Sequence, residues 1–148
     1  RDLATSLSKL GDVAVAEGNL GAARLAYGEG LEIARALSAA DPSSAAARRD
    51  VAVSLERMGA TEMAAGNSAA AAEWFRQEAE ISAALMAADP LNAGAKRFHA
   101  VVLLQWGQAS QERERFEEAY AILKAMDEAG QLEPRDRPML ESVAALFD

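Results

Sequence analysis

Apolar residues recur along most of the chain at the three- and four-residue spacing of an amphipathic helix. Leu3, Leu7 and Leu10 begin the first stripe, and a second stripe runs from Leu20 to Ala40. Gly18-Asn19 supplies a helix stop between them, and Asp41-Pro42 ends the second stripe, so together they predict one helical hairpin. No segment shows the sustained alternation of a β-strand. The helices that we expect are 2–17, 20–40, 43–65, 68–88, 91–112 and 116–129.

This hairpin pattern repeats after 48 residues. Shifted by that length, Arg1-Asp2 aligns with Arg49-Asp50, Gly18-Asn19 with Gly66-Asn67, and Asp41-Pro42 with Asp89-Pro90. Roughly twenty of the 48 pairs are identical, which is far above chance even in an alanine-rich chain. A third, weaker copy begins at Arg97. We expect one domain over 1–148, with repeat 1 at 1–42, repeat 2 at 43–90 and repeat 3 at 91–130.

The two ends of the array differ. After Gly130 and a charged, proline-containing link, Leu140, Val143, Ala144 and Phe147 fall on one helical face. They predict a capping helix at 134–147 that covers the third hairpin. The N-terminal end has no such cap. We therefore expect either that a repeat or domain precedes Arg1, the chain being a fragment of a longer protein, or that the uncapped N-terminal face pairs with a second copy as a homodimer.

Three short motifs carry a family resemblance. Leu7-x-x-Leu10-Gly11 followed by Ala23-x-x-x-Tyr27 resembles the tetratricopeptide repeat. The second copy has Leu55-x-x-Met58-Gly59 and Ala71-x-x-x-Phe75, and the third has Leu103-x-x-Trp106-Gly107 with Arg115 to Tyr120. The resemblance covers nearly the whole chain. It implies an all-α fold, a right-handed superhelical stack of antiparallel helical hairpins (an α-solenoid) with about three hairpins and a C-terminal capping helix.

The repeat departs from the family in length, because 48 residues replace the family's roughly 34. The surplus amounts to about seven residues on each helix, nearly two α-helical turns, so the helices lengthen without rotating their buried face. A helical glycine costs about 1 kcal/mol relative to alanine and needs a compensating close contact. We expect Gly11, Gly59 and Gly107 to lie where the two helices of a hairpin cross, opposite Ala23, Ala71 and Ala119.

Charge and composition narrow the partners. The net charge of −8 disfavours a nucleic acid and an anionic membrane surface. The absence of cysteine excludes disulfides and thiolate chemistry and fits a reducing compartment, and no apolar run is long enough to span a bilayer. We expect a cytoplasmic protein, and the alanine-rich, long-repeat pattern looks bacterial.

No set of residues converges on a reaction. His99 has no second histidine with which to share a metal and no G-x-S-x-G motif to serve, so we expect a packed or surface residue. Gly28-x-Gly30 follows no strand and cannot form a phosphate loop. The acidic run from Glu112 to Glu118 alternates with Arg113 and Arg115, which is typical of a solvated face with local ion pairs. We expect no enzymatic activity, no cofactor and no metal.

The large aromatic residues fall into two groups by expected burial. Phe75 and Trp106 occupy positions that the family buries, so we expect both in the core. Trp74 and Phe98 are expected to be partly exposed, where inter-repeat packing and partner contact are the alternatives.

By resemblance, the first helix of each hairpin lines a concave groove. The groove positions are Thr5, Ser8, Asp12, Val15, Val53, Glu56, Ala60, Met63, Val101, Leu104, Gln108, Gln111 and Glu112. The family's cationic clamp for peptide carboxylates is absent from them. They form an apolar floor with acidic flanks, which predicts a protein or peptide partner with apolar anchors and basic residues. A protein–protein interaction scaffold is the leading hypothesis, and a peptide or small-molecule sensor and a self-assembly domain are the alternatives.

Overall fold

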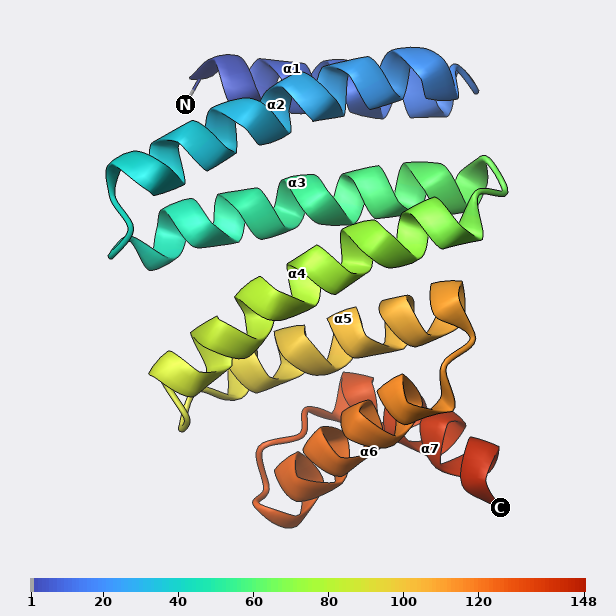
Figure 1. Ribbon diagram of the computed structural model, residues 1–148. Helices are drawn as coiled ribbons and strands as arrows, with labels where there is room; N and C mark the ends of the chain where they lie inside the picture. The colour runs from blue at the N-terminus through green and yellow to red at the C-terminus, as the bar shows by residue number, and fades with distance from the viewer. Residues whose placement is uncertain (1) are drawn as a thin grey trace.

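Helices account for most of the computed structural model, which describes residues 2–148 (Figure 1). Over these residues, seven α-helices follow one another as packed antiparallel neighbours, which confirms the all-α class. Arg1, where repeat 1 was placed to begin, lies outside the described residues. The helices are α1 (Asp2–Ala16), α2 (Leu20–Ala40), α3 (Ala45–Ala64), α4 (Ser68–Ala88), α5 (Ala93–Ser110), α6 (Arg113–Glu128) and α7 (Arg137–Ala144), with 3₁₀ turns η1 (Pro134–Asp136) and η2 (Ala145–Phe147).

The hairpin turns of the first two repeats share one local structure. Gly18 and Gly66 have φ angles of 74° and 80°, in the left-handed region that favours glycine. The next backbone N–H in each turn donates to a carbonyl five residues back, Asn19 to Ala14 and Asn67 to Glu62, each at 2.8 Å. This bond closes the C-terminal end of the helix. The predicted helix stops are therefore confirmed.

Three helix starts differ from the sequence prediction by two or three residues. The Ser44 side chain accepts a hydrogen bond from the N–H of Ala47, so α3 begins at Ala45, not at 43. Asn92 caps α5 in the same way, and α5 begins at Ala93 in place of 91. The start of α6 was also wrong. Gln111 adopts φ 61°, which ends α5 at Ser110 and lets α6 begin at Arg113 in place of 116.

Each repeat glycine lies against an aromatic ring of the second helix. A Cβ on Gly59 would lie 2.6 Å from Cε1 of Phe75, and a Cβ on Gly11 would overlap the ring of Tyr27. The expected close crossing is confirmed, but the group that faces the glycine is this ring and not the alanine that we expected. In the third hairpin a Cβ on Gly107 would lie 3.1 Å from Phe116. The alanines are fully buried nearby: Ala23, Ala71 and Ala119.

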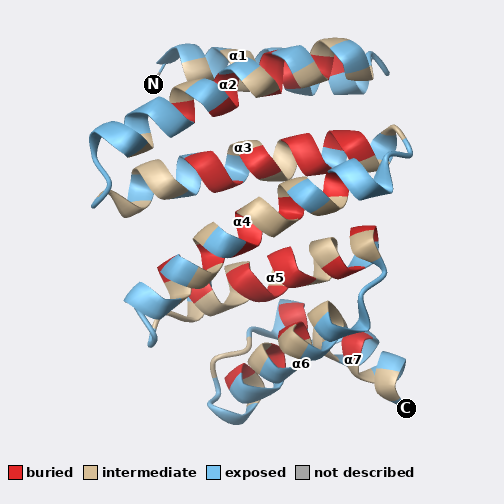
Figure 2. Cartoon of the chain, viewed as in Figure 1, coloured by how far each residue is buried: buried red, intermediate tan, exposed pale blue. Residues whose placement is uncertain are grey.

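The hairpins pack on one another through the same positions of the repeat. At the first joint, one apolar cluster combines Tyr27, Leu31 and Ala34 of α2 with Val51, Leu55 and Met58 of α3. At the second joint, Ser82 and His99 replace Ala34 and Val51, and the Ser82 hydroxyl lies 2.8 Å from His99 Nδ1. Trp74 is half-buried against the first joint, whereas Phe75 is 3% exposed. Buried residues gather on α3 and α5, which have a neighbour on both sides, and are few on α1 (Figure 2).

The predicted capping segment covers the third hairpin. Val143 joins Ala100 and Leu123 in one buried cluster, and Leu140 and Phe147 pack against it. Asp136 at the start of the segment is 3% exposed and accepts two hydrogen bonds of 2.8 Å from Arg97 of α5. The cap is therefore held by apolar burial and by two ion pairs, Arg97–Asp136 and Arg137–Asp127.

We predict that Asp136→Ala lowers the free energy of unfolding by about 1–2 kcal/mol, because Arg97 loses both acceptors but is exposed enough to rehydrate. Arg97 lowers the pKa of Asp136, so this stabilisation is present above the ordinary pKa of 3.8 and is lost as the pH falls through the lower, folded-state pKa. Urea titrations of the two chains measure the difference. The exposed Asp148→Ala is the control, and an equal effect of both changes would contradict the prediction.

Candidate binding surface

The first helices of hairpins 1 and 2 border a pocket of about 400 Å³. Thr5, Ser8 and Asp12 of α1 form one wall, and Val53 and Arg57 of α3 form the other. Leu37 of α2 contributes an apolar surface between them and is 43% exposed. The pocket is thus built from three consecutive helices.

A second pocket of about 330 Å³ lies between α3, α4 and α5. Leu85 and Phe98 make it apolar, and the first residues of α5 close one side. Val53 is 45% exposed and lines both pockets, so they adjoin at α3. We call this surface, bordered by Thr5, Ser8, Asp12, Leu37, Val53, Arg57, Leu85 and Phe98, the Val53 groove.

Seven of the thirteen predicted groove positions lie in or beside this surface. Thr5, Ser8, Asp12 and Val53 line the larger pocket. Glu56 and Ala60 line a smaller hollow of about 120 Å³ together with Val15. Because Arg57 borders both, the hollow adjoins the Val53 groove.

The remaining predicted positions have other surroundings. Met63 packs beside Phe75 and Ala109, and Leu104 packs against the cluster under the C-terminal cap. Gln111 ends α5, and its side-chain amide donates to the Gln108 carbonyl at 2.7 Å. Glu112 accepts a hydrogen bond from Arg115, and Val101 is half-buried on α5. These residues have the predicted repeat register. Most of them, however, pack against other helices or form the turn between α5 and α6.

Cations line the groove beside the predicted acids. Lys9 and Arg57 border the larger pocket with Asp12, and Arg49 borders the second pocket. Sequence reasoning missed Arg49 and Arg57, although each lies four residues from Val53 and so falls on the same helical stripe. The sides of the groove, which we expected to be acidic, therefore carry both acidic and basic residues.

Asp12 is already engaged inside its own hairpin. The Tyr27 hydroxyl donates to Asp12 Oδ1 at 2.7 Å, and Arg57 Nε lies 3.8 Å from the same oxygen. Burial, followed by the bond to Asp12, raises the pKa of Tyr27 to about 12. The tyrosine thus stays protonated at neutral pH and keeps donating to Asp12.

Two carboxylates meet a less polar environment in hairpin 2. Burial raises the pKa of the half-buried Glu56. Burial, and then the charge of Glu56, raises the pKa of Glu78 to about 8. Glu78 is 1% exposed, and its Oε2 finds no hydrogen-bond partner among residues 2–148. The sequence signal that could have found it is the replacement of Gly30 by Glu78 between the two repeats.

The residues considered as candidates for catalysis or metal binding are either buried in the core or paired with neighbouring charges. His99 is 8% exposed, burial lowers its pKa, and Ser82 beside it is fully buried. The acids of the 112–118 run pair locally with Arg113 and Arg115. Within residues 2–148, no group of three or more histidine or carboxylate side chains is placed to hold a metal ion. Over the same residues, every helix is too short or too polar to cross a membrane.

Comparison with known proteins finds no match for the chain among family models, curated proteins or solved structures. What the structure shows is a series of consecutive antiparallel helices, each packed against the next.

Proposed function

We propose that the chain is a tetratricopeptide-like scaffold that binds a peptide segment of a protein partner in the Val53 groove. The observation that carries the proposal is the position of Val53, an exposed apolar residue that borders both adjoining pockets. In a right-handed superhelical stack, α1, α3 and α5 would form the concave face. The proposed role is binding without catalysis.

The lining of the groove indicates the chemistry of its ligand. Leu37, Val53, Leu85 and Phe98 offer apolar contacts along a path that crosses three hairpins. Pockets of this kind can receive apolar side chains, and an extended or helical segment can present such side chains at regular spacing. Acids and bases both line the path, so we propose that the segment carries apolar anchors flanked by charged residues, basic ones included, which pair with Asp12 and Asp50.

A selection from a displayed library of random twelve-residue peptides on the immobilised chain tests this function. We expect enriched peptides with two or more large apolar residues. We also expect Val53→Asp to weaken their binding at least tenfold, because it places a charge where both pockets meet. Fluorescence polarisation with labelled peptides measures the affinity.

The matched control is Leu146→Asp, which changes an exposed leucine near the C-terminus. We expect it to alter affinity less than twofold. Enriched peptides that bind both variants equally would place binding outside the groove, and a selection without enrichment would contradict a peptide-binding function.

A further inference from the structure

The N-terminal end of the stack exposes a face that the later hairpins bury. Leu3 and Leu10 of α1 are 63% and 59% exposed. The positions 48 residues later, on α3, are 7% and 8% exposed because α2 covers them. In repeat register, Leu3, Leu7 and Leu10 of α1 correspond to Val51, Leu55 and Met58 of α3.

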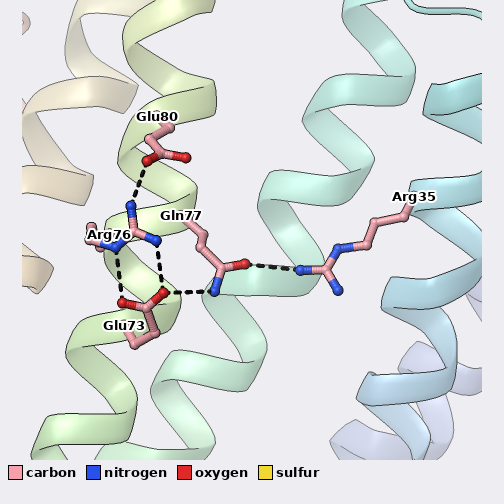
Figure 3. Close-up of polar contacts among 5 residues, drawn as sticks. All are labelled: Arg35, Glu73, Arg76, Gln77 and Glu80. Atoms are coloured by element: carbon pink, nitrogen blue, oxygen red, sulfur yellow. Dashed lines mark hydrogen bonds and ion pairs between the residues drawn. The ribbon is translucent and has the colours of Figure 1, made fainter.

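The outer surface of α2 in the same hairpin is also apolar. Leu25 is 73% exposed, and a shallow depression lies beside it at Gly28, where an added Cβ would meet nothing within 4 Å. On α4 the same two positions hold Glu73 and Arg76, which form an ion pair of 2.8 Å (Figure 3). Hairpin 1 thus has apolar and small residues where hairpin 2 has a polar network. We call Leu3, Leu7, Leu10, Leu25, Glu29 and Ile33 the end face.

The first joint shows which surface fits such a face. There Tyr27, Leu31 and Ala34 of α2 pack against α3 in one apolar cluster. Arg35, the next residue, reaches α4, where its Nη2 donates to Gln77 Oε1 at 2.9 Å (Figure 3). Ile81 of α4 also packs against this cluster, and its equivalent on the end face is Ile33.

The end face differs from this joint in one informative position. The residue in register with Gln77 is Glu29, which is exposed. An arginine placed as Arg35 is placed would therefore meet a carboxylate in place of an amide, and a charge-assisted hydrogen bond is about twice as strong as a neutral one. The end face is thus complementary in shape and in charge to the second helix of a hairpin.

We propose that the end face docks a partner helical hairpin of this chain's own 48-residue pattern. Its second helix carries an aromatic residue, a leucine and an alanine at the spacing of Tyr27, Leu31 and Ala34, followed directly by an arginine that pairs with Glu29. Two copies of this chain joined face to face lack that pair, because Arg35 is bonded to Gln77 on the other side of α2. The surface is separate from the Val53 groove.

An extended chain tests the proposal. A second copy of residues 1–48 is joined ahead of residue 1, so that the repeat register continues. The chain has no cysteine, so Leu10→Cys on the original α1 gives a single thiol whose maleimide labelling rate reports coverage of the end face. We expect the extension to slow labelling at least tenfold. Arg35→Glu in the added hairpin is expected to restore at least a third of the lost labelling rate. Combining it with Glu29→Arg on the original α2 is expected to make labelling slow again.

The matched control is Glu17→Arg, at an exposed position of the turn between α1 and α2, which we expect to leave the Arg35→Glu effect unchanged. Equal labelling with and without the added hairpin would overturn the proposal. Labelling that stays slow in the Arg35→Glu variant would overturn the assigned pairing with Glu29. Sedimentation equilibrium of the unextended chain supplies the last outcome: a dimer whose labelling slows with concentration would assign the end face to a second copy.

Discussion

Glu78→Met is expected to raise the free energy of unfolding at pH 7 by about 3 kcal/mol, because the folded-state pKa is about 8 and each pH unit between the ordinary pKa of 4.5 and pH 7 contributes about 1.4 kcal/mol. The carboxylate is buried inside hairpin 2 and has one oxygen without a partner. Methionine has a similar volume and no group to ionise. The gain therefore comes from removing a carboxyl group that is ionised in the unfolded chain and must take up a proton when folding buries it in an apolar site.

The direction of the pKa shift determines how the effect of Glu78→Met on stability changes with pH. The folded-state pKa of Glu78 is raised, so the folded chain holds the proton more tightly than the unfolded chain does. No stability is lost below the ordinary pKa, and the loss grows as the pH rises from about 4.5 to about 8. The advantage of Glu78→Met is thus expected to be small near pH 4.5 and to widen steadily up to pH 8.

Chemical denaturation of both chains across this pH range measures the difference, and the contributions of His99 and Asp136 cancel in it. Glu29→Met is the control, because Glu29 is exposed on the equivalent second helix. Its effect is expected to stay within about 0.5 kcal/mol at every pH. A Glu78→Met advantage that is constant from pH 4.5 to 8 would show that the pKa of Glu78 is not raised in the folded chain.

Gly59→Ala is expected to lower the free energy of unfolding by about 2 kcal/mol. Alanine by itself favours a helix over glycine by about 1 kcal/mol, so the intrinsic effect has the opposite sign. The new Cβ would lie 2.6 Å from Cε1 of Phe75, whose ring is 3% exposed and closely surrounded. Overpacking costs about 1–3 kcal/mol. A contact as short as 2.6 Å belongs at the upper end of that range, so a net loss of about 2 kcal/mol remains after the gain in helix propensity.

Two further variants separate crowding from other causes. Gly28→Ala is the matched control, because its Cβ would meet nothing within 4 Å, and it is expected to stabilise the chain by up to about 1 kcal/mol. Combining Gly59→Ala with Phe75→Leu is expected to cost less than the sum of the two single changes, since the smaller side chain leaves room for the new methyl. Strict additivity in this cycle would contradict the crowding explanation.

The helices and their stops were predictable from the sequence because local interactions decide them. Gly18, Gly66 and Gly130 each adopt a positive φ at the end of a helix, as the helix-stop residues predicted. The start of α6 was not predictable in this way. Gln111 takes the left-handed conformation that the sequence gives no reason to assign to a glutamine, and the helix boundary moves by three residues.

The candidate groove was predictable only in its first half. Thr5, Ser8, Asp12 and Val53 come together because α1 and α3 carry the same repeat with the same register. In the third hairpin, Leu104 turns to the cluster beneath the cap, and Gln111 forms the turn. The cap and the early start of α6 change what lies beside α5, and a repeat register contains no information on either.

The sequence by itself determined the all-α class, the helix stops at glycine and the apolar stripe of each helix, because each depends on residues within one or two helical turns. Tertiary structure decided the rest. It placed an aromatic ring over each repeat glycine, left Glu78 without a partner inside hairpin 2, and brought Arg57 beside Asp12. Each of these features depends on how closely one helix approaches another, and that distance is fixed only when both side-chain surfaces are packed.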